Sequence, residues 1–119
     1  MEKPQPKSQQ ESPEGVLVVL TTTDSRAKAD TLARGAVEAR LAACVQVGAP
    51  VTSTYRWEGT VETGEEWQVL LKTSEARYDE LERWLTEHHD YETPEIIALP
   101  VVRGGPGYLA WVREETSAT

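Results

Sequence analysis

The sequence has little of several features that define whole classes of protein. Cys44 is the single cysteine among its 119 residues, so no disulfide forms within the chain, which suits a reducing compartment. No apolar run approaches the length of about 18 residues that a membrane-spanning helix needs. No basic segment precedes a hydrophobic stretch near the first residue, as it does in a secretory signal peptide. We therefore expect a cytoplasmic protein with no membrane association.

Basic residues and catalytic motifs are also scarce. The chain carries 12 Lys and Arg residues against 20 Asp and Glu residues, a formal net charge of -8, and the basic residues are scattered. Because nucleic-acid-binding proteins cluster Lys and Arg against phosphates, we expect no nucleic-acid partner. The sequence contains no Cys-x-x-Cys, no His-x-x-x-His and no glycine-rich phosphate loop. The sequence contains no recognisable set of catalytic residues, so we do not expect an enzyme.

The first residues differ in composition from the rest of the chain. Residues 1–14 contain three prolines, three glutamines and two serines, and no aliphatic or aromatic side chain. Such a segment buries too little apolar surface to offset the entropy lost on ordering. The composition predicts a disordered N-terminal tail over 1–14, one folded domain over 15–115 and a C-terminal tail over 116–119. A domain of about 100 residues needs no disulfide or structural metal to fold.

The spacing of apolar residues along the sequence alternates between patterns typical of strands and of helices. The run Val16–Leu20 is apolar on both faces and predicts a buried strand with central or parallel neighbours. Apolar residues three and four apart predict a helix from 29 to 41, capped by Asp24 or Ser25, and a second from 74 to 89. The run IIALPV predicts a strand over 96–101, and a short helix follows over 108–115.

Between the two long helices, the pattern predicts a long β-hairpin. Residues 43–57 alternate in character, with a bend at 48–50, and residues 61–73 return as a second strand after a turn at 58–60. The order is therefore β-α-β-β-α-β with a short C-terminal helix. This order predicts an α+β ferredoxin-like sandwich with both long helices on one face of a four-stranded sheet.

The hairpin is too long for a domain of this size. A globule of about 105 residues has a diameter of roughly 33 Å, whereas residues 45–57 extended at about 3.3 Å each reach roughly 43 Å. We expect the tip to overhang and to carry Tyr55, Trp57 and Trp67. Apolar groups projecting from a small monomer indicate an interface, and contact with a different surface of the next copy favours a ring.

Five segments in order carry a resemblance to a known family. They are Leu41–Val45 (LAACV), Tyr55–Gly59 (YRWEG), Leu71–Thr73 (LKT), His88–Glu95 (HHDYETPE) and Tyr108–Trp111 (YLAW). Together they resemble the CutA family of divalent-cation tolerance proteins over about residues 15–113. The resemblance implies a ferredoxin-like subunit, a homotrimer joined by its long strands, a role in the response to metal ions, copper binding and no obligatory cofactor. It also implies an architecture similar to that of the PII signalling proteins.

Four residues are candidates for holding copper or another divalent metal ion. Cys44 supplies a thiolate, but copper needs two or more good donors, and a buried cysteine that packs as a small hydrophobe is the alternative. His88 shares the apolar helical stripe and is expected to point inward, with His89 toward the edge of that stripe. A hydrogen-bonded core histidine is the alternative to a ligand that acts beside Glu95.

A second set of residues predicts a small-molecule cleft. Lys72 is expected on the face of its strand opposite to the apolar residues. If other residues enclose its ammonium group, it suits either an anionic ligand or a structural ion pair. Tyr91 and Trp57 are expected to contact the same ligand, although aromatic residues on strands also serve as core or interface residues. A sensor that binds an anionic metabolite between subunits is therefore the alternative to a metal-binding trimer. A scaffold role is a third alternative, and an enzyme using His88 with Glu95 is the last.

Overall fold

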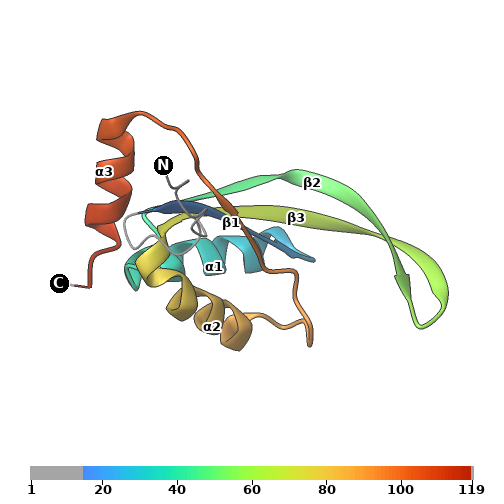
Figure 1. Cartoon of the computed structure of the whole chain (residues 1–119). Helices are drawn as coiled ribbons and strands as arrows, with labels where there is room; N and C mark the ends of the chain where they lie inside the picture. Colours follow the sequence, from blue (N-terminus) through green and yellow to red (C-terminus); the bar gives the residue numbers. More distant parts are fainter. Residues whose placement is uncertain (1–14, 119) are drawn as a thin grey trace, which may run out of the picture.

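The computed structural model describes residues 15–118 of the chain and has four strands and three α-helices in the predicted order (Figure 1). The strands are β1 (Val16–Thr23), β2 (Cys44–Trp57), β3 (Thr60–Ser74) and β4 (Ile97–Pro100). The α-helices are α1 (Arg26–Glu38), α2 (Tyr78–His88) and α3 (Pro106–Glu115), and the short 3-10 helix η2 (Glu75–Arg77) leads into α2. The disordered tail predicted over 1–14 lies outside the described residues.

One four-stranded sheet has the order β2-β3-β1-β4, and every pair is antiparallel. The predicted central position of β1 is confirmed, and its neighbours are antiparallel. Pro100 ends β4 at the edge of the sheet, where its missing N–H is tolerated. The order and connections confirm the predicted ferredoxin-like α+β fold.

The core lies between the sheet and the helices α1 and α2. Val19, Val69 and Leu71 from the strands meet Leu81 and Leu85 of α2, and all five side chains are fully buried. Small residues let α1 approach closely. At Gly35, an added Cβ would lie 2.8 Å from Cζ2 of Trp84, so a side chain there would force the Trp84 ring to shift where α1 meets α2.

The ends of two helices differ from the prediction. Ser25 caps α1 by accepting a hydrogen bond from the Lys28 backbone N–H, as expected. Ser74 makes no side-chain cap, because the chain enters α2 through η2. At the other end of the domain, Thr116 was predicted to begin a tail, but it caps α3, is buried and donates to Ser74 Oγ over 3.0 Å.

The C-terminal helix is fastened to the turn that follows α1. Arg40 has a backbone φ of 60°, in the left-handed region, and its guanidinium donates hydrogen bonds to the carbonyls of Glu114 and Ser117. A second apolar cluster joins α3 to the sheet through Val16, Ala43 and Val112. The helix therefore belongs to the folded domain, at the end opposite the hairpin tip (Figure 1).

The hairpin of β2 and β3 projects from the domain and curls (Figure 1). The molecule measures 54 × 36 × 24 Å, with a radius of gyration of 16.0 Å against about 13 Å for a compact domain of this length. The predicted bend is a β-bulge between Val47 and Pro50. Trp67 lies opposite Pro50 and packs on the core, so it stands at the base of the hairpin and not at its tip.

Candidate functional site

The four predicted metal ligands lie at different places in one subunit. Cys44 begins β2 opposite Lys72 and is half-buried. His88 and His89 lie at the far end of α2, and Glu95 lies in the loop that follows it. Within residues 15–118, no three His, Cys, Asp or Glu side chains converge as a metal site. The metal site stays a prediction, which would require donors from more than one subunit.

The predicted orientations of the two histidines are reversed. His88 is exposed, and its ring stacks on Trp84 at a centroid distance of 4.2 Å. The His89 side chain is only 1% exposed. The prediction for His89 failed because α2 ends at His88, and His89 has an extended backbone with φ of -85° and ψ of 145°. The helical periodicity used to place both rings does not apply to His89.

A hydrogen-bonded core histidine was the alternative predicted for His88. In the structure His89 has that role. Its Nε2 lies 2.7 Å from the carbonyl oxygen of Thr22, and its Nδ1 accepts a hydrogen bond of 3.1 Å from the Tyr91 backbone N–H. Because Nδ1 accepts, Nε2 carries the proton and donates to Thr22. Both ring nitrogens are therefore occupied by backbone partners, and His89 fixes the turn at 89–91 onto β1.

A charged cluster surrounds the hollow between α1 and α2. Lys28 pairs with Asp24 at 2.8 Å and with Asp90, and all three side chains are partly exposed. Hydrogen bonds to Asp24 and Asp90 raise the pKa of Lys28, and the hydrogen bond from Lys28 lowers the pKa of Asp90. The hollow, about 480 Å³, also has His88 on its wall. Its lysine is neutralised by two carboxylates, which leaves little attraction for an anion.

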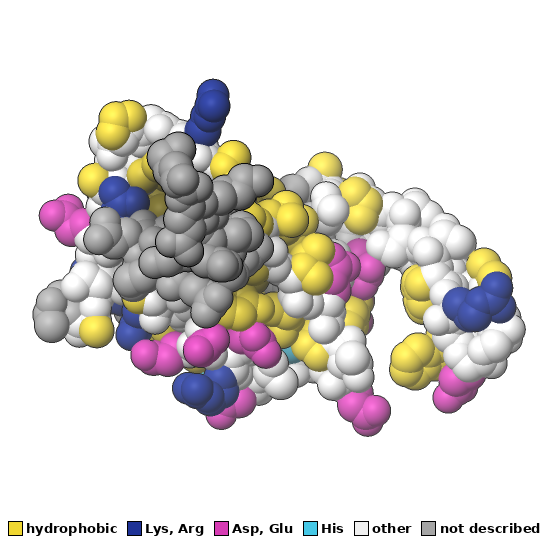
Figure 2. Space-filling view, in the orientation of Figure 1, with side chains coloured by type: hydrophobic (Ala, Val, Ile, Leu, Met, Phe, Trp, Pro, Cys, Tyr) yellow, Lys and Arg dark blue, Asp and Glu magenta, His cyan; other side chains and the backbone are white. Residues whose placement is uncertain are grey.

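A larger groove lies under the curled hairpin, where hydrophobic and acidic side chains face each other across the hollow in Figure 2. Its volume is about 850 Å³. Residues from β2 and β3 form one wall, and residues from the loop after α2 form the other. The aromatic and acidic residues that line it are Tyr55, Trp57, Glu62, Glu66, Tyr91, Glu92 and Glu95. The structure thus brings four of the predicted site residues, Tyr55, Trp57, Tyr91 and Glu95, to one place.

The two walls of the groove are joined by one hydrogen bond. The Tyr91 hydroxyl donates to Glu66 Oε2 over 2.8 Å. Burial and this hydrogen bond both raise the pKa of Tyr91, so the phenol keeps its proton at neutral pH. Tyr91 also contacts the His89 ring at a centroid distance of 4.6 Å. The loop wall is therefore held by the buried histidine behind it.

Lys72 does not belong to this groove. Its ammonium donates to Gln46 Oε1 over 2.9 Å and lies 6.0 Å from the ring centroid of Tyr108. It is opposite Cys44 on β2 and Val18 on β1, near α3. The predicted cleft of Trp57, Lys72 and Tyr91 is therefore not assembled within one subunit, and an anionic ligand would find no lysine beside the two aromatic rings.

Glu62 and Glu66 are groove residues that sequence reasoning missed. Glu62 lies opposite Tyr55 and Glu66 opposite Val51 in the β2–β3 ladder. Their even spacing along one strand was visible in the sequence. The residues opposite them on β2 could not be predicted, because the bulge shifts the register of the two strands.

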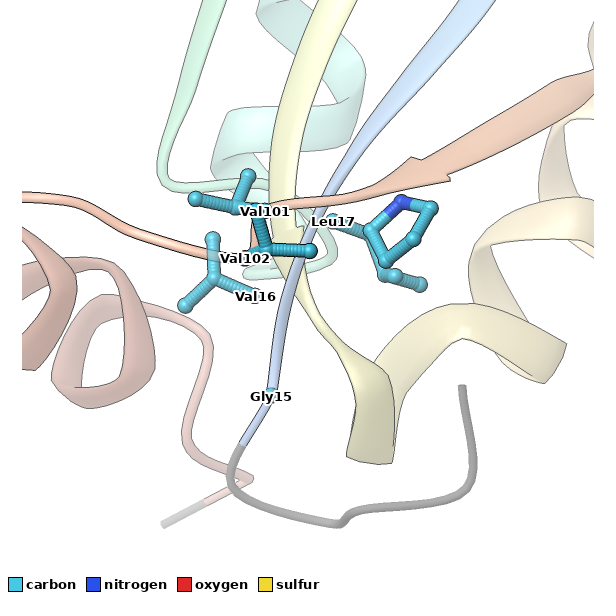
Figure 3. A pocket seen from close by; sticks show the side chains of 6 residues that line it. Gly15, Val16, Leu17, Val101 and Val102 are labelled. Atoms are coloured by element: carbon cyan, nitrogen blue, oxygen red, sulfur yellow. The ribbon is translucent and has the colours of Figure 1, made fainter. Parts of the chain in front are cut away.

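A further hollow of about 220 Å³ is lined by Gly15, Val16, Leu17, Pro100, Val101 and Val102 (Figure 3). It holds no titratable side chain and offers no chemistry.

None of the helices within residues 15–118 combines the length and apolar character needed to cross a membrane.

Comparison with known proteins agrees with this architecture. The model of the family described as CutA1 divalent ion tolerance protein matches residues 17–115. The divalent-cation tolerance protein CutA of Thermus thermophilus is 43% identical over 99 residues, which are 83% of this chain and 96% of that protein. A solved structure of divalent cation tolerance protein Cut A1 from Thermus thermophilus has a TM-score of 0.84 at 42% identity, covering 86% of this chain and 99% of that one.

A plant protein shows the same similarity in three dimensions. The crystal structure of CutA1 from Oryza sativa superposes with a TM-score of 0.85 at 34% identity, covering 88% of this chain and 96% of that chain. The chain belongs to the CutA1 family of divalent ion tolerance proteins.

Proposed function

We propose that this protein serves divalent-cation tolerance as a homotrimer that binds copper or another divalent metal ion weakly where subunits meet. The observation that carries the proposal is the projecting hairpin, whose length gives the molecule its 54 Å dimension. A ribbon that leaves its own domain needs a second surface to cover its apolar residues. The role is one of binding and not of catalysis.

Apolar residues are exposed on two separate parts of the molecule. Tyr55, Trp57 and Val61 lie on the hairpin and are 46%, 55% and 60% exposed. Ile97 and Leu99 of the opposite edge strand, β4, are 48% and 53% exposed. When two different surfaces of one chain meet, the contact is head-to-tail, and it forms a ring when the rotation between neighbouring copies closes. This supports a trimer more than a two-fold dimer.

The metal-binding part of the proposal rests on Cys44. A single thiolate does not hold copper, and the described part of the chain gathers no three-donor cluster. Cys44 is half-buried and unpaired, so its sulfur is available to a shared site. We place the second donor on a neighbouring subunit, with His88 as the candidate because its ring is exposed.

The trimer is tested by light scattering on the purified protein. Trp57→Asp places a carboxylate on the hairpin tip and should lower the mass from three chains to one. Val37→Asp is the matched control, because Val37 is 41% exposed and lies on α1, which is neither the hairpin nor β4. An intact trimer in the Trp57 variant would remove the assignment of the hairpin to the interface.

The metal site is tested by calorimetric titration of the reduced protein with copper. Cys44→Ser should abolish saturable binding, and His88→Ala should weaken it at least about tenfold if histidine supplies the second donor. Equal affinities in wild type and Cys44→Ser would exclude the thiol. Both variants must first show the wild-type mass.

A cytoplasmic location is part of the proposal, because an unpaired cysteine suits a reducing compartment. Fractionation of the source cells should recover the protein with soluble cytoplasmic marker enzymes, and recovery with another compartment would contradict it.

A further inference from the structure

A neighbouring copy that covers the groove under the hairpin meets both aromatic rings and carboxylates. Tyr55 and Trp57 on the hairpin wall are 46% and 55% exposed. Four carboxylates line the groove and no Lys or Arg does; they are those of Glu62, Glu66, Glu92 and Glu95. Within the described part of the chain, none of the four forms a salt bridge with a basic residue. Because burying unpaired carboxylates costs free energy, the segment that covers the rings must also bring a positive charge.

Three basic side chains among residues 15–118 have no hydrogen-bond or ion-pair partner within the chain, and they are Arg56, Arg83 and Arg103. Arg56 lies on β2 between the two aromatic residues of the groove, so the alternation of the strand turns it to the opposite face. Arg83 lies on α2 and shares its surface with three carboxylates. Arg103 is therefore the candidate that can bring its charge to another copy.

Arg103 follows the edge strand β4 and adjoins an exposed apolar surface. Val102 is 74% exposed, and Ile97 and Leu99 of β4 are 48% and 53% exposed. Residues 102–104 lie outside the helices and strands. This segment presents a guanidinium beside apolar side chains, and the groove presents carboxylates beside aromatic rings. Arginine suits both parts of the groove, because it donates paired hydrogen bonds to carboxylates and stacks on aromatic faces.

Within one chain, segment 102–104 and the groove lie at opposite ends of the sheet (Figure 1). Strand β4 ends at Pro100, which pairs with Leu17 near the start of β1. Thr22, which lines the groove, lies five residues further along β1, about 17 Å away. Segment 102–104 continues beyond Pro100, away from the groove. A contact between the two surfaces therefore joins different copies and is head-to-tail.

We propose that segment 102–104 of one copy docks in the groove of the next copy, with the Arg103 guanidinium against the carboxylates and the aromatic rings. The proposal rests on the proposed homotrimer and names the contact that joins its subunits. The groove has a volume of about 850 Å³, which accommodates a short segment of chain. Tyrosine, tryptophan and arginine are the residues enriched at the centres of protein interfaces.

The experiment measures the mass of the native protein by light scattering at about 0.15 M salt. Arg103→Glu reverses the charge of the segment and should lower the mass from three chains to one. Arg83→Glu is the matched control, because it makes the same change in net charge at an exposed arginine of α2, and it should leave the mass unchanged. Glu62→Lys with Glu95→Lys reverses one carboxylate on each wall of the groove and should also give single chains.

Combining the reversals in one chain separates a contact from a general defect in the subunit. The chain with Arg103→Glu, Glu62→Lys and Glu95→Lys should return to the mass of three chains, because opposite charges again meet across the contact. Arg103→Gln removes the charge without reversing it, and this variant should dissociate at a protein concentration at least about tenfold higher than wild type. Circular dichroism of each variant shows whether the subunit is folded.

The outcomes distinguish this contact from the homotrimer itself. A trimeric wild type together with a trimeric Arg103→Glu variant would overturn the contact and leave the homotrimer standing. A combined variant that folds but stays a single chain would also overturn it. Equal loss of mass in Arg83→Glu would mean that net charge, and not a contact, controls assembly. A wild type that is a single chain would remove both the contact and the homotrimer.

Discussion

Replacing His89 by alanine removes the side chain that joins the turn at 89–91 to strand β1. The ring is nearly fully buried and makes two hydrogen bonds, at 2.7 Å to the Thr22 carbonyl and at 3.1 Å from the Tyr91 N–H. A buried hydrogen bond contributes about 1 kcal/mol, and a buried polar group left without a partner costs about 1–3 kcal/mol. We expect the free energy of unfolding to fall by about 2–4 kcal/mol.

His88→Ala is the control, because it changes the same residue type one position earlier. His88 is exposed, and its ring makes one hydrogen bond of 2.8 Å to the Trp84 carbonyl, within the same helix. Alanine also has the higher helix propensity, so the loss should stay below about 1 kcal/mol. Urea denaturation must be followed at one protomer concentration, since dissociation contributes to the stability of an oligomer. An equal loss in both variants would refute the distinction between a buried and an exposed histidine.

Three further predictions concern packing and pH. Gly35→Ala should cost about 1–3 kcal/mol of unfolding free energy, because its Cβ would lie 2.8 Å from Trp84, whereas Gly107→Ala meets nothing within 4 Å and should cost nothing; equal urea midpoints would contradict this. Thr21→Val should stabilise by about 1 kcal/mol, since the Thr21 hydroxyl is buried without a partner, and a lower melting temperature would contradict it. Burial raises the pKa of Tyr78 from 10.0 to about 12, so its contribution to stability is complete below pH 10 and is lost as pH rises toward 12. Tyr78→Phe should therefore lose less stability than wild type over that interval in urea titrations, and an identical loss would contradict the shift.

The fold was predictable because each element has a local signal that agrees with its final environment. The apolar run of β1 becomes the central strand, and the small residues of α1 become its contact with the core. The bend near Pro50 was visible as a proline and a glycine within an alternating strand. The predicted overhang of the hairpin followed from length alone, since a ribbon of that length exceeds the diameter of its domain.

The candidate site was less predictable, because it depends on where elements end and how they curl. Helical periodicity placed His88 inside, but the helix stops at that residue, and the next residue turns inward instead. Lys72 was grouped with Trp57 because a lysine outside the apolar face of its strand suits an anionic ligand, for which aromatic residues would supply the walls of a cleft. The ladder places Lys72 opposite Cys44 and Trp57 opposite Thr60, at the two ends of the hairpin. No local pattern encodes that separation.

The β-bulge determines which side of the ribbon each later residue occupies. Before it, Val45 and Val47 pack toward the helices; after it, Tyr55 and Trp57 lie on the other side, although all four positions are odd-numbered. Deleting one residue there, such as Ala49, would restore regular alternation and turn both aromatic rings over. An insertion or deletion of one residue within this short stretch therefore reverses the face on which every later side chain of β2 lies. It would remove the groove although the sequence still contains all the residues that line it.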